Sequence, residues 1–424
     1  MKVHALKVIL ISLLLSILTN TLIAGNIDKT IRYDVCFTGK ADHWDVIHSQ
    51  TKIVSSATGN LNYEKHFADK GNMRLVVKET ETGDTLFIKG FSPLFQEWLL
   101  TSEANTKERE FYQALYFPHP SKDVLVSIDL RNIEGQWGQK YADTLFISDI
   151  RIKNEKPKKY KIDTLLYSGH SQEKIDLVFL SEGYTREEMD KYVADAKRMA
   201  RFLLDFQPFN EFQDKFNLYA IQVPSAESGA DEPEIGILKN TAFNATWNTF
   251  ESERYLTSGD MLQISNAADE VSWDQIVIIV NSARYGGGGF YNWLSIFSSD
   301  HQQSELVFIH EFGHAFAGLA DEYYYNGDIE DTTYPITIEP WEPNITTLVQ
   351  FDKKWKGSIS HKTPLPTPRD SMYINTIGLF EGGGYRTKGI YSPSITCLMK
   401  TLSTKSFCPV CQEAIRQTIL NQAK

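Results

Sequence analysis

The sequence predicts a mixed α+β or α/β fold, in which a small β-sandwich-like domain precedes a domain of α/β character. Residues 31–153 contain short alternating strands at regular spacing, which is typical of a small β-sandwich. From about residue 164, apolar strands alternate with a long helical pattern, which indicates α/β architecture. The charged, proline-containing stretch 153–163 is typical of a linker. We therefore expect a β-sandwich-like domain over residues 25–160 and a second domain over residues 161–424.

The clearest local signal in the first part is a β-hairpin. Residues 73–78 and 85–89 are short strand-like runs on either side of the turn sequence ETGD at 81–84. Further strands of this kind are expected at residues 32–37, 124–130 and 144–147.

The second part begins with a buried strand at residues 175–180 and a helix at 186–206. Thr185 and Glu188 have the spacing of a capping box at the start of this helix. Strands are expected at residues 216–223, 275–280 and 293–297, and a glycine-rich bend at 285–289. Residues 275–280 are apolar enough to be buried on both faces of a sheet.

The charge balance excludes one class of partner. The 424-residue chain has a formal net charge of -11, whereas phosphate binding needs clustered Lys and Arg. We therefore expect no nucleic-acid partner. A solvated acidic surface also suits an exported protein, because it favours solubility.

The N-terminus has the pattern of a secretory signal peptide. Lys2 and Lys7 precede an apolar run from Val8 to Ile23, and residues 22–24 have the character of a cleavage site. The apolar run is short for a membrane anchor, and no second stretch is long enough to span a bilayer. We expect a signal peptide over residues 1–24, an exported protein (periplasmic, cell-surface or secreted) and no stable membrane insertion.

The four cysteines are unevenly distributed. Cys36 stands alone and is expected to be a buried thiol, whereas Cys397, Cys408 and Cys411 lie close to the C-terminus. Export permits disulfides, so we expect a structural disulfide from Cys397 to Cys408 or Cys411. A zinc site or redox pair at Cys408-Pro-Val-Cys411 is the alternative, although a second cysteine pair is absent.

The segment HEFGH at residues 310–314 is the candidate for a catalytic metal site. A spacing of four residues places His310 and His314 on one face of a helix, where both can reach one metal ion. Glu311 lies beside the metal and could accept a proton from a zinc-bound water. The alternative is a chance occurrence of these residues on a buried helix.

A catalytic zinc ion usually has three protein ligands and one open position. Gly318 can end the helix, and Asp321 follows at a distance that lets the chain return to the metal. We expect Asp321 as the third ligand. Glu322 is the competitor, with Glu330 or His361 as more distant possibilities.

The stretch HEFGHAFAGLADEY at residues 310–323 resembles the active-site sequence of the IgA peptidase M64 family of bacterial zinc metallopeptidases. Further segments match that family's pattern; these are DLVFLSEGYT at 176–185, ESGADEP at 227–233 and NSARYGG at 281–287. The resemblance covers roughly residues 165–424. It implies a metzincin-like domain with a mixed sheet, a long active-site helix and one catalytic zinc ion.

This chain departs from the metzincin pattern at one place. That pattern puts a glycine three residues and the third ligand six residues after the second histidine, where this chain has Ala317 and Ala320. The glycine and the acid come one residue later, at Gly318 and Asp321.

The resemblance also implies roles for residues outside the helix. Residues 396–399 resemble the methionine turn, so Met399 would form an apolar floor under the ligands; the alternative is an ordinary core methionine. Tyr391 could donate a hydrogen bond to the oxyanion, although most such tyrosines are surface residues. The strand at 294–297 resembles an edge strand that pairs with a peptide substrate.

Asp231 and Glu234 could bind calcium, although a loop with two carboxylates is usually only solvated.

The hypothesis that follows is a secreted zinc metalloendopeptidase acting on extracellular proteins. Its partners would be protein or peptide substrates, and the family name suggests immunoglobulin A or other host glycoproteins. The alternatives are a zinc amidase acting on peptidoglycan and a non-catalytic adhesion protein with a structural metal. The sequence specifies neither the cleavage site nor the oligomeric state.

Overall fold

The computed structural model describes residues 29–54, 68–154, 160–325 and 333–423. The signal peptide predicted for residues 1–24 lies outside the described residues. Within them, no helix has both the length and the apolar character needed to cross a bilayer. The described chain is mixed α/β with several sheets, so this part of the predicted fold class is confirmed.

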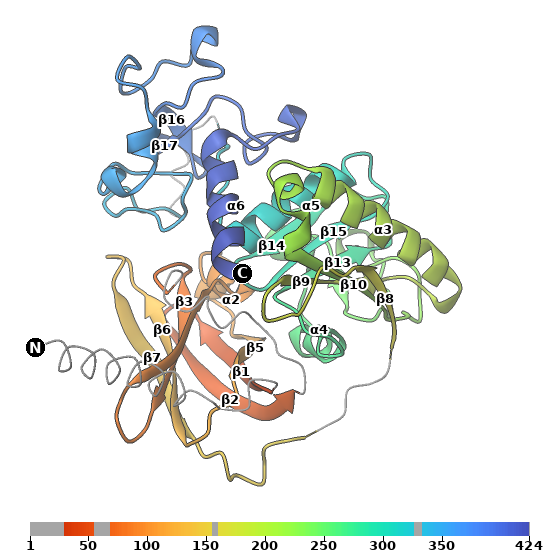
Figure 1. Cartoon of the computed structure of the whole chain (residues 1–424). Helices are drawn as coiled ribbons and strands as arrows, with labels where there is room; N and C mark the ends of the chain where they lie inside the picture. The colour runs from red at the N-terminus through yellow and green to blue at the C-terminus, as the bar shows by residue number, and fades with distance from the viewer. Residues whose placement is uncertain (1–28, 55–67, 155–159, 326–332, 424) are drawn as a thin grey trace, which may run out of the picture.

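Two antiparallel sheets form the N-terminal part (Figure 1). Their strands are β1 (Thr30–Lys40), β2 (His43–Val54), β3 (Met73–Glu79), β4 (Thr85–Phe91), β5 (Arg109–Pro118), β6 (Val124–Arg131) and β7 (Trp137–Leu145). The strand orders are β2-β1-β5 and β4-β3-β6-β7. The hydroxyl groups of Tyr33 and Tyr141 meet at 2.7 Å and link β1 to β7. A short helix, α2 (Leu94–Trp98), follows β4.

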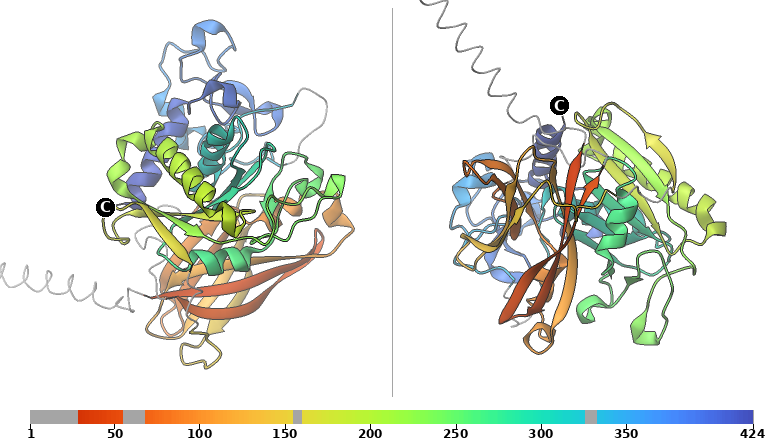
Figure 2. Two further views of the ribbon diagram at one scale, coloured as in Figure 1. Left: turned by 90° about the vertical axis from the view of Figure 1, so that its right-hand side faces the viewer. Right: turned by 90° about the horizontal axis from the view of Figure 1, so that it is seen from below.

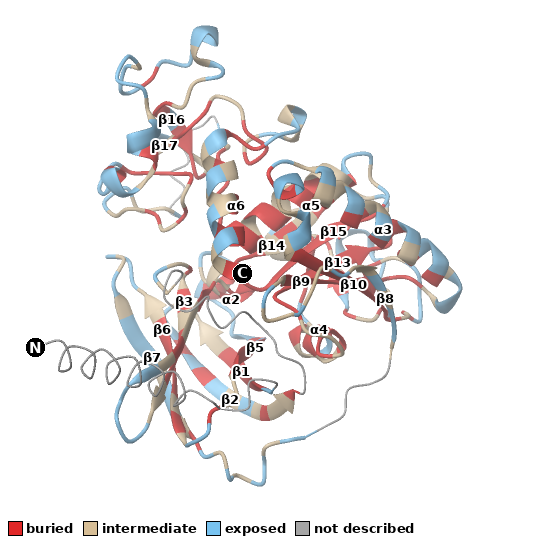
Figure 3. Cartoon of the chain, viewed as in Figure 1, coloured by how far each residue is buried: buried red, intermediate tan, exposed pale blue. Residues whose placement is uncertain are grey.

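The expected hairpin at residues 73–89 is confirmed as β3 and β4. Strands β2 and β5 were not predicted, and the strand expected at 144–147 is instead the end of β7. Many residues of β7 are exposed, so this strand lacks the apolar run that would have shown its full length (Figure 3).

The second part is built on a six-stranded sheet in the order β14-β15-β13-β9-β10-β8. Its strands are β8 (Lys161–Leu166), β9 (Ile175–Glu182), β10 (Phe216–Gln222), β13 (Gln275–Val280), β14 (Gly287–Phe290) and β15 (Leu294–Ser298). The four inner strands are parallel, and the two edge strands run antiparallel to them. Every residue of β9 and β13 is buried, as expected for strands covered on both faces.

Two expectations for this part were wrong. The linker predicted for residues 153–163 extends too far, because residues 161–166 form the edge strand β8. The glycine-rich bend is instead the start of the other edge strand, β14, and the strand expected at 294–297 lies inside the sheet as β15.

Helices cover one face of the central sheet, and the N-terminal sheets pack on the other. Leu177 and Phe179 of β9 pack with α3 (Met189–Asp205), α5 (Ser304–Phe312) and α6 (Pro409–Gln422). Val178 and Leu180 point the other way and share a cluster with the N-terminal sheets. Helix α4 (Met261–Ala268) lies between the N-terminal strands and the central sheet (Figure 1, Figure 2).

A buried ion pair joins the two parts. Arg32 of β1 donates to Asp34 at 2.7 Å and to Asp269, just after α4, at 2.9 Å. Separating the two parts would leave the buried Arg32 without one of its two carboxylate partners, which is energetically costly. The ion pair therefore stabilises the contact between the N-terminal sheets and the second part.

The capping box predicted for Thr185 and Glu188 is present, and the helix it begins ends at Asp205. Short two-stranded pairs complete the chain, formed by β11 (Ala245–Thr246) with β12 (Thr257–Ser258) and by β16 (Phe380–Gly383) with β17 (Arg386–Ser392).

All four cysteines are buried free thiols. The predicted disulfide among the C-terminal cysteines is therefore wrong for this structure. The sulfurs of Cys397 and Cys411 lie 3.7 Å apart, whereas a disulfide bond is about 2.05 Å long.

Candidate metal centre

The two histidines of the HEFGH segment face each other. His310 belongs to α5, and His314 lies in a short π-helical turn, Gly313–Ala317, that continues it. The Nε2 atoms of the two rings are 3.2 Å apart. The expected arrangement of two imidazoles on one helical face is therefore present in the structure.

The chain then turns back and brings Asp321 to the same point. Gly318 ends the helix with a φ of 66°, a left-handed conformation that glycine adopts at low cost. Asp321 Oδ1 lies 3.1 Å from His310 Nε2 and 3.4 Å from His314 Nε2. These three residues form a group able to hold one metal ion, which we call the open centre.

The other candidates for the third ligand lie elsewhere. The side chain of Glu322 is fully buried and faces the C-terminal cysteines. His361 is exposed, and Glu330 lies outside the described residues.

Hydrogen bonds orient the three donors. His310 Nδ1 donates to the Leu398 carbonyl at 3.1 Å, and His314 Nδ1 donates to the Leu319 carbonyl at 2.6 Å. Because a carbonyl can only accept, Nδ1 carries the proton and Nε2 is left free as a metal ligand. Tyr385 donates its hydroxyl to Asp321 Oδ2 at 2.6 Å and leaves Oδ1 facing the rings.

The donor set suits a divalent cation. Asp321 Oδ1 is buried and accepts no hydrogen bond of normal geometry within the described residues. When both rings are neutral, the two Nε2 lone pairs and Asp321 Oδ1 point at the same place, so three electron-rich atoms converge. A cation relieves that repulsion, and two imidazoles with one carboxylate match the ligands that zinc prefers.

Charges within the centre shift its pKa values strongly. Burial lowers the pKa of His314, but Asp321 and Glu311 outweigh it and raise the pKa to about 9. Burial raises the pKa of Asp321, yet the two histidines hold it well below its usual range. Burial is also the largest cause of the raised pKa of Glu311, as suits a proton acceptor near neutral pH.

Strand β14 lies directly against this helix. A Cβ atom on Gly287 would stand 2.7 Å from Glu311 Oε1, and one on Gly289 would stand 2.3 Å from the Glu311 carbonyl oxygen. The glycines therefore let an edge strand approach the helix that carries Glu311. The outer edge of β14 already forms one hydrogen bond within the protein, because Leu256 donates its N–H to the Gly287 carbonyl at 3.3 Å.

The sequence profile described as IgA Peptidase M64 matches residues 164–376 and 369–419. A second profile, described as Peptidase M64 N-terminus, matches residues 25–142. The chain belongs to the IgA peptidase M64 family. Membership implies hydrolysis of peptide bonds and, in general, dependence on a metal. A search of curated proteins found no match for this M64 chain.

Met399 lies under the helix of this M64 peptidase. Its side chain is fully buried, and a Cβ on Gly313, between the two histidines, would stand 3.1 Å from Met399 Sδ. Its neighbour Leu398 supplies the carbonyl that orients His310.

Tyr391 is not part of the open centre. Its ring packs with Phe351, Trp355 and Leu379, and its backbone pairs with Thr346. These contacts give no support to the oxyanion role predicted for Tyr391.

The carboxylates considered for calcium have protein partners. Asp231 Oδ1 accepts from the Lys239 N–H at 2.5 Å, and Glu234 forms an ion pair with Arg284. Among the described residues, neither belongs to a group with the geometry of a metal site.

Several residues near the open centre were not predicted from the sequence. Arg254 donates to the hydroxyls of Tyr323 and Tyr325 at 3.2 and 2.8 Å, and its charge acts on both Asp321 and Glu311. Glu97 of α2 comes from the N-terminal part; burial is the largest cause raising its pKa to about 7. The glycine run before Tyr385 was the one local signal that could have marked that residue.

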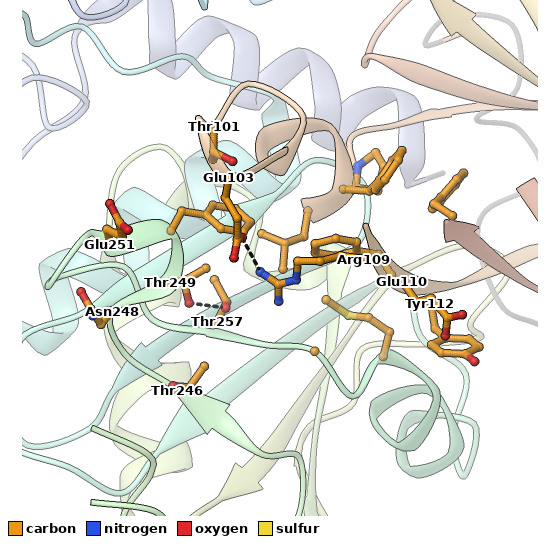
Figure 4. Close-up of a pocket in the computed structure, with 18 of the residues that line it drawn as sticks. Thr101, Glu103, Arg109, Glu110, Tyr112, Thr246, Asn248, Thr249, Glu251 and Thr257 are labelled. Atoms are coloured by element: carbon orange, nitrogen blue, oxygen red, sulfur yellow. Dashed lines mark hydrogen bonds and ion pairs between the residues drawn. The ribbon is translucent and has the colours of Figure 1, made fainter. Parts of the chain in front are cut away.

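A cavity of about 340 Å³ is lined by residues of both the N-terminal part and the second part (Figure 4). Glu103 and Arg109 line one side and are joined by a 3.1 Å ion pair, while Thr249 and Thr257 line the other. The residues of the open centre do not line it. The cavity therefore lies apart from the peptidase chemistry.

Proposed function

We propose that this chain is a secreted zinc-dependent metalloendopeptidase that hydrolyses peptide bonds of extracellular proteins. The observation that carries the proposal is the convergence of His310 Nε2, His314 Nε2 and Asp321 Oδ1 within 3.4 Å of one another. The side chains of the two histidines remain 14% and 18% exposed, so the group keeps a side open to substrate. Catalytic zinc sites keep such an open position, whereas structural sites are closed.

Each residue would have one role in the reaction. A zinc ion, when bound by the open centre, supplies Lewis acidity that polarises the peptide carbonyl and lowers the pKa of a water molecule. Glu311 accepts the proton from the attacking water and delivers it to the leaving amine. Asp321 and the two histidines stay fixed, because Tyr385 and two backbone carbonyls hold them in orientation.

Arg254 is the group that we place opposite the developing negative charge. Two tyrosine hydroxyls hold its guanidinium, and its charge reaches both Glu311 and Asp321. A fixed cation near the reacting carbonyl would stabilise an oxyanion. This assignment replaces the role predicted for Tyr391.

The decisive test is Glu311→Gln in the zinc-loaded protein. We expect hydrolysis of a broad protein panel to fall by about 10²–10⁴-fold, because the proton acceptor is lost, while metal content stays unchanged. The matched control is Glu305→Gln in the first turn of the same helix, where the carboxylate pairs with Arg198 on the surface. Wild-type rates in Glu311→Gln would refute the mechanism.

The substrate can be identified by cleavage-site profiling, in which the protein is added to serum proteins with and without a chelator. Cleavage within immunoglobulin A would support the substrate that the family description names. Release of peptidoglycan fragments instead would favour the amidase, and stoichiometric metal with no turnover would favour an adhesion protein. N-terminal sequencing of the exported protein should give a start at Gly25 if residues 1–24 are a signal peptide.

A further inference from the structure

A second group of potential metal ligands lies behind the open centre. It consists of Glu322, Cys397, Cys408 and Cys411, whose donor atoms all lie within 4.8 Å of one another. All four residues are buried, with exposed fractions of 0 to 4%. They come from three places in the chain, namely the segment after the active-site helix, the turn that holds Met399 and the N-terminal end of α6.

The spacing of these atoms matches a tetrahedral ion. For zinc, with bonds of about 2.3 Å to sulfur and 2.0–2.2 Å to oxygen, the edges of a tetrahedron are about 3.5–3.8 Å long. The sulfurs of Cys397 and Cys411 are 3.7 Å apart, and Cys411 Sγ is 3.2 Å from Glu322 Oε1. Cys408 Sγ is 3.9 Å from the same oxygen. Small shifts would place all four donors around one ion.

The backbone supports thiolates at this place. Cys408 is the N-cap of α6 and Cys411 lies in its first turn, where unpaired N–H groups favour negative charge. The Cys408 N–H also donates to Cys397 Sγ at 3.3 Å. A sulfur that accepts a backbone hydrogen bond is more easily kept as a thiolate.

The buried carboxylate needs a stronger partner than thiols. Asn344 Nδ2 donates to Glu322 Oε1 at 3.1 Å, and thiol groups are only weak donors. Glu322 Oε2 accepts no hydrogen bond within the described residues, and Lys400 Nζ is 3.9 Å from it. A disulfide between two of the sulfurs would leave the third thiol unpaired, and the carboxylate would keep only Asn344 and the distant ammonium group of Lys400. A divalent cation satisfies all four side chains at once.

We propose that Glu322, Cys397, Cys408 and Cys411 form a second, structural zinc site, which we call the sealed site. Binding requires that the three thiols release their protons to solvent while the zinc ion keeps its oxidation state, so no oxidant is needed. The site goes beyond the proposed peptidase function and does not depend on it. Four protein ligands and complete burial leave the ion no open position.

The sealed site would brace the open centre. Glu322 directly follows Asp321, and its N–H donates to the Met399 carbonyl at 2.8 Å. Leu398, next to Met399, orients His310 through its carbonyl. One ion would therefore tie α6, the Met399 segment and the third ligand into a single rigid unit.

The test uses the full chain after export, under non-reducing conditions. Metal analysis should find about two zinc ions per chain in the wild type and about one in His310→Ala/His314→Ala, which lacks the open centre. Cobalt loaded into that double variant should show thiolate-to-cobalt charge-transfer absorption. Absence of both the remaining zinc ion and this absorption would overturn the proposal.

Thiol counting distinguishes the metal site from a disulfide. After denaturation with a chelator and no reductant, mass spectrometry should show all four cysteines alkylated. Alkylation of two fewer would show a disulfide and refute the sealed site.

Two cysteine variants test whether the metal is bound by the thiols of the sealed site. Cys411→Ser should lose the cobalt charge-transfer band, whereas the control Cys36→Ser, a buried thiol on β1, should keep it. If Cys411→Ser fails to fold, the metal and thiol counts on the wild type and the double histidine variant still decide the question. Because none of these readouts is activity, an inactive enzyme with a filled sealed site would refute only the peptidase function.

Discussion

Two neighbouring carboxylates, Asp321 and Glu322, have opposite surroundings. Asp321 faces two histidines that retain 14–18% of their exposure, whereas Glu322 faces three buried thiols. The backbone explains the difference, because the Asp321 carbonyl accepts from the Gly384 N–H on one side and the Glu322 N–H donates to the Met399 carbonyl on the other. Successive side chains of such an extended segment point in opposite directions. Burial and the type of donor atom therefore distinguish a centre suited to catalysis from one suited to a structural metal ion.

Exchanging the two carboxylates for amides gives the largest expected effect. Asp321→Asn should weaken metal binding at the open centre more than about 100-fold and abolish hydrolysis, because a charged ligand is lost. Glu322→Gln should keep most of the hydrolysis but lower the melting temperature and the zinc content. Metal analysis, peptide hydrolysis and thermal unfolding measure the three quantities. Identical behaviour of the two variants would remove the distinction between the sites.

The close contact of β14 with the active-site helix gives a second prediction. Gly289→Ala should destabilise the fold by about 1–3 kcal/mol and reduce hydrolysis, because the new methyl group overlaps the Glu311 carbonyl. Gly259→Ala is the control, since a Cβ there would meet no atom within 4 Å. Denaturant unfolding and kcat/KM of both variants provide the comparison. Equal stability of the Gly289→Ala and Gly259→Ala variants would show that β14 is not in close contact with the helix at Gly289.

The support given to Asp321 by Tyr385 should be worth about 10–100-fold in metal affinity at the open centre. Tyr385→Phe removes the 2.6 Å hydrogen bond and keeps the ring. A competing chelator measures the affinity, and the sealed site should be unaffected. The prediction fails if the variant binds metal as tightly as the wild type.

Metal binding at the open centre should also depend on pH. In the metal-free protein, burial lowers the pKa of His314 but the nearby carboxylates raise it to about 9. Below that value the ring holds a proton that must leave before Nε2 can bind metal. Apparent affinity should therefore rise with pH, by up to about tenfold per unit for each proton released. Chelator competition between about pH 6 and 8 tests this, and a flat profile would contradict it.

The parts predicted from the sequence are those with local causes. His310 and His314 share one helix, the capping box spans Thr185 to Glu188, and the apolar run 275–280 forms a buried strand as expected. In each case, residues within about one helical turn or one strand determine the structure.

The parts that were missed depend on contacts distant in sequence. Tyr385 lies 64 residues from Asp321, and Cys411 lies 89 residues from Glu322. The sequence pattern favoured a disulfide because it could not show a carboxylate beside the thiols. Strand β14 was missed because glycine usually weakens a strand, whereas here the nearby helix requires its small size.

The hydrogen bond from His310 to Leu398 links residues 88 positions apart, and α6 follows it close to the end of the chain. A nascent chain that has not yet reached residue 398 therefore has both histidines but neither the carbonyl that orients one of them nor the methionine beneath them. The two histidines are thus synthesised before the segment that orients one of them and lies beneath both.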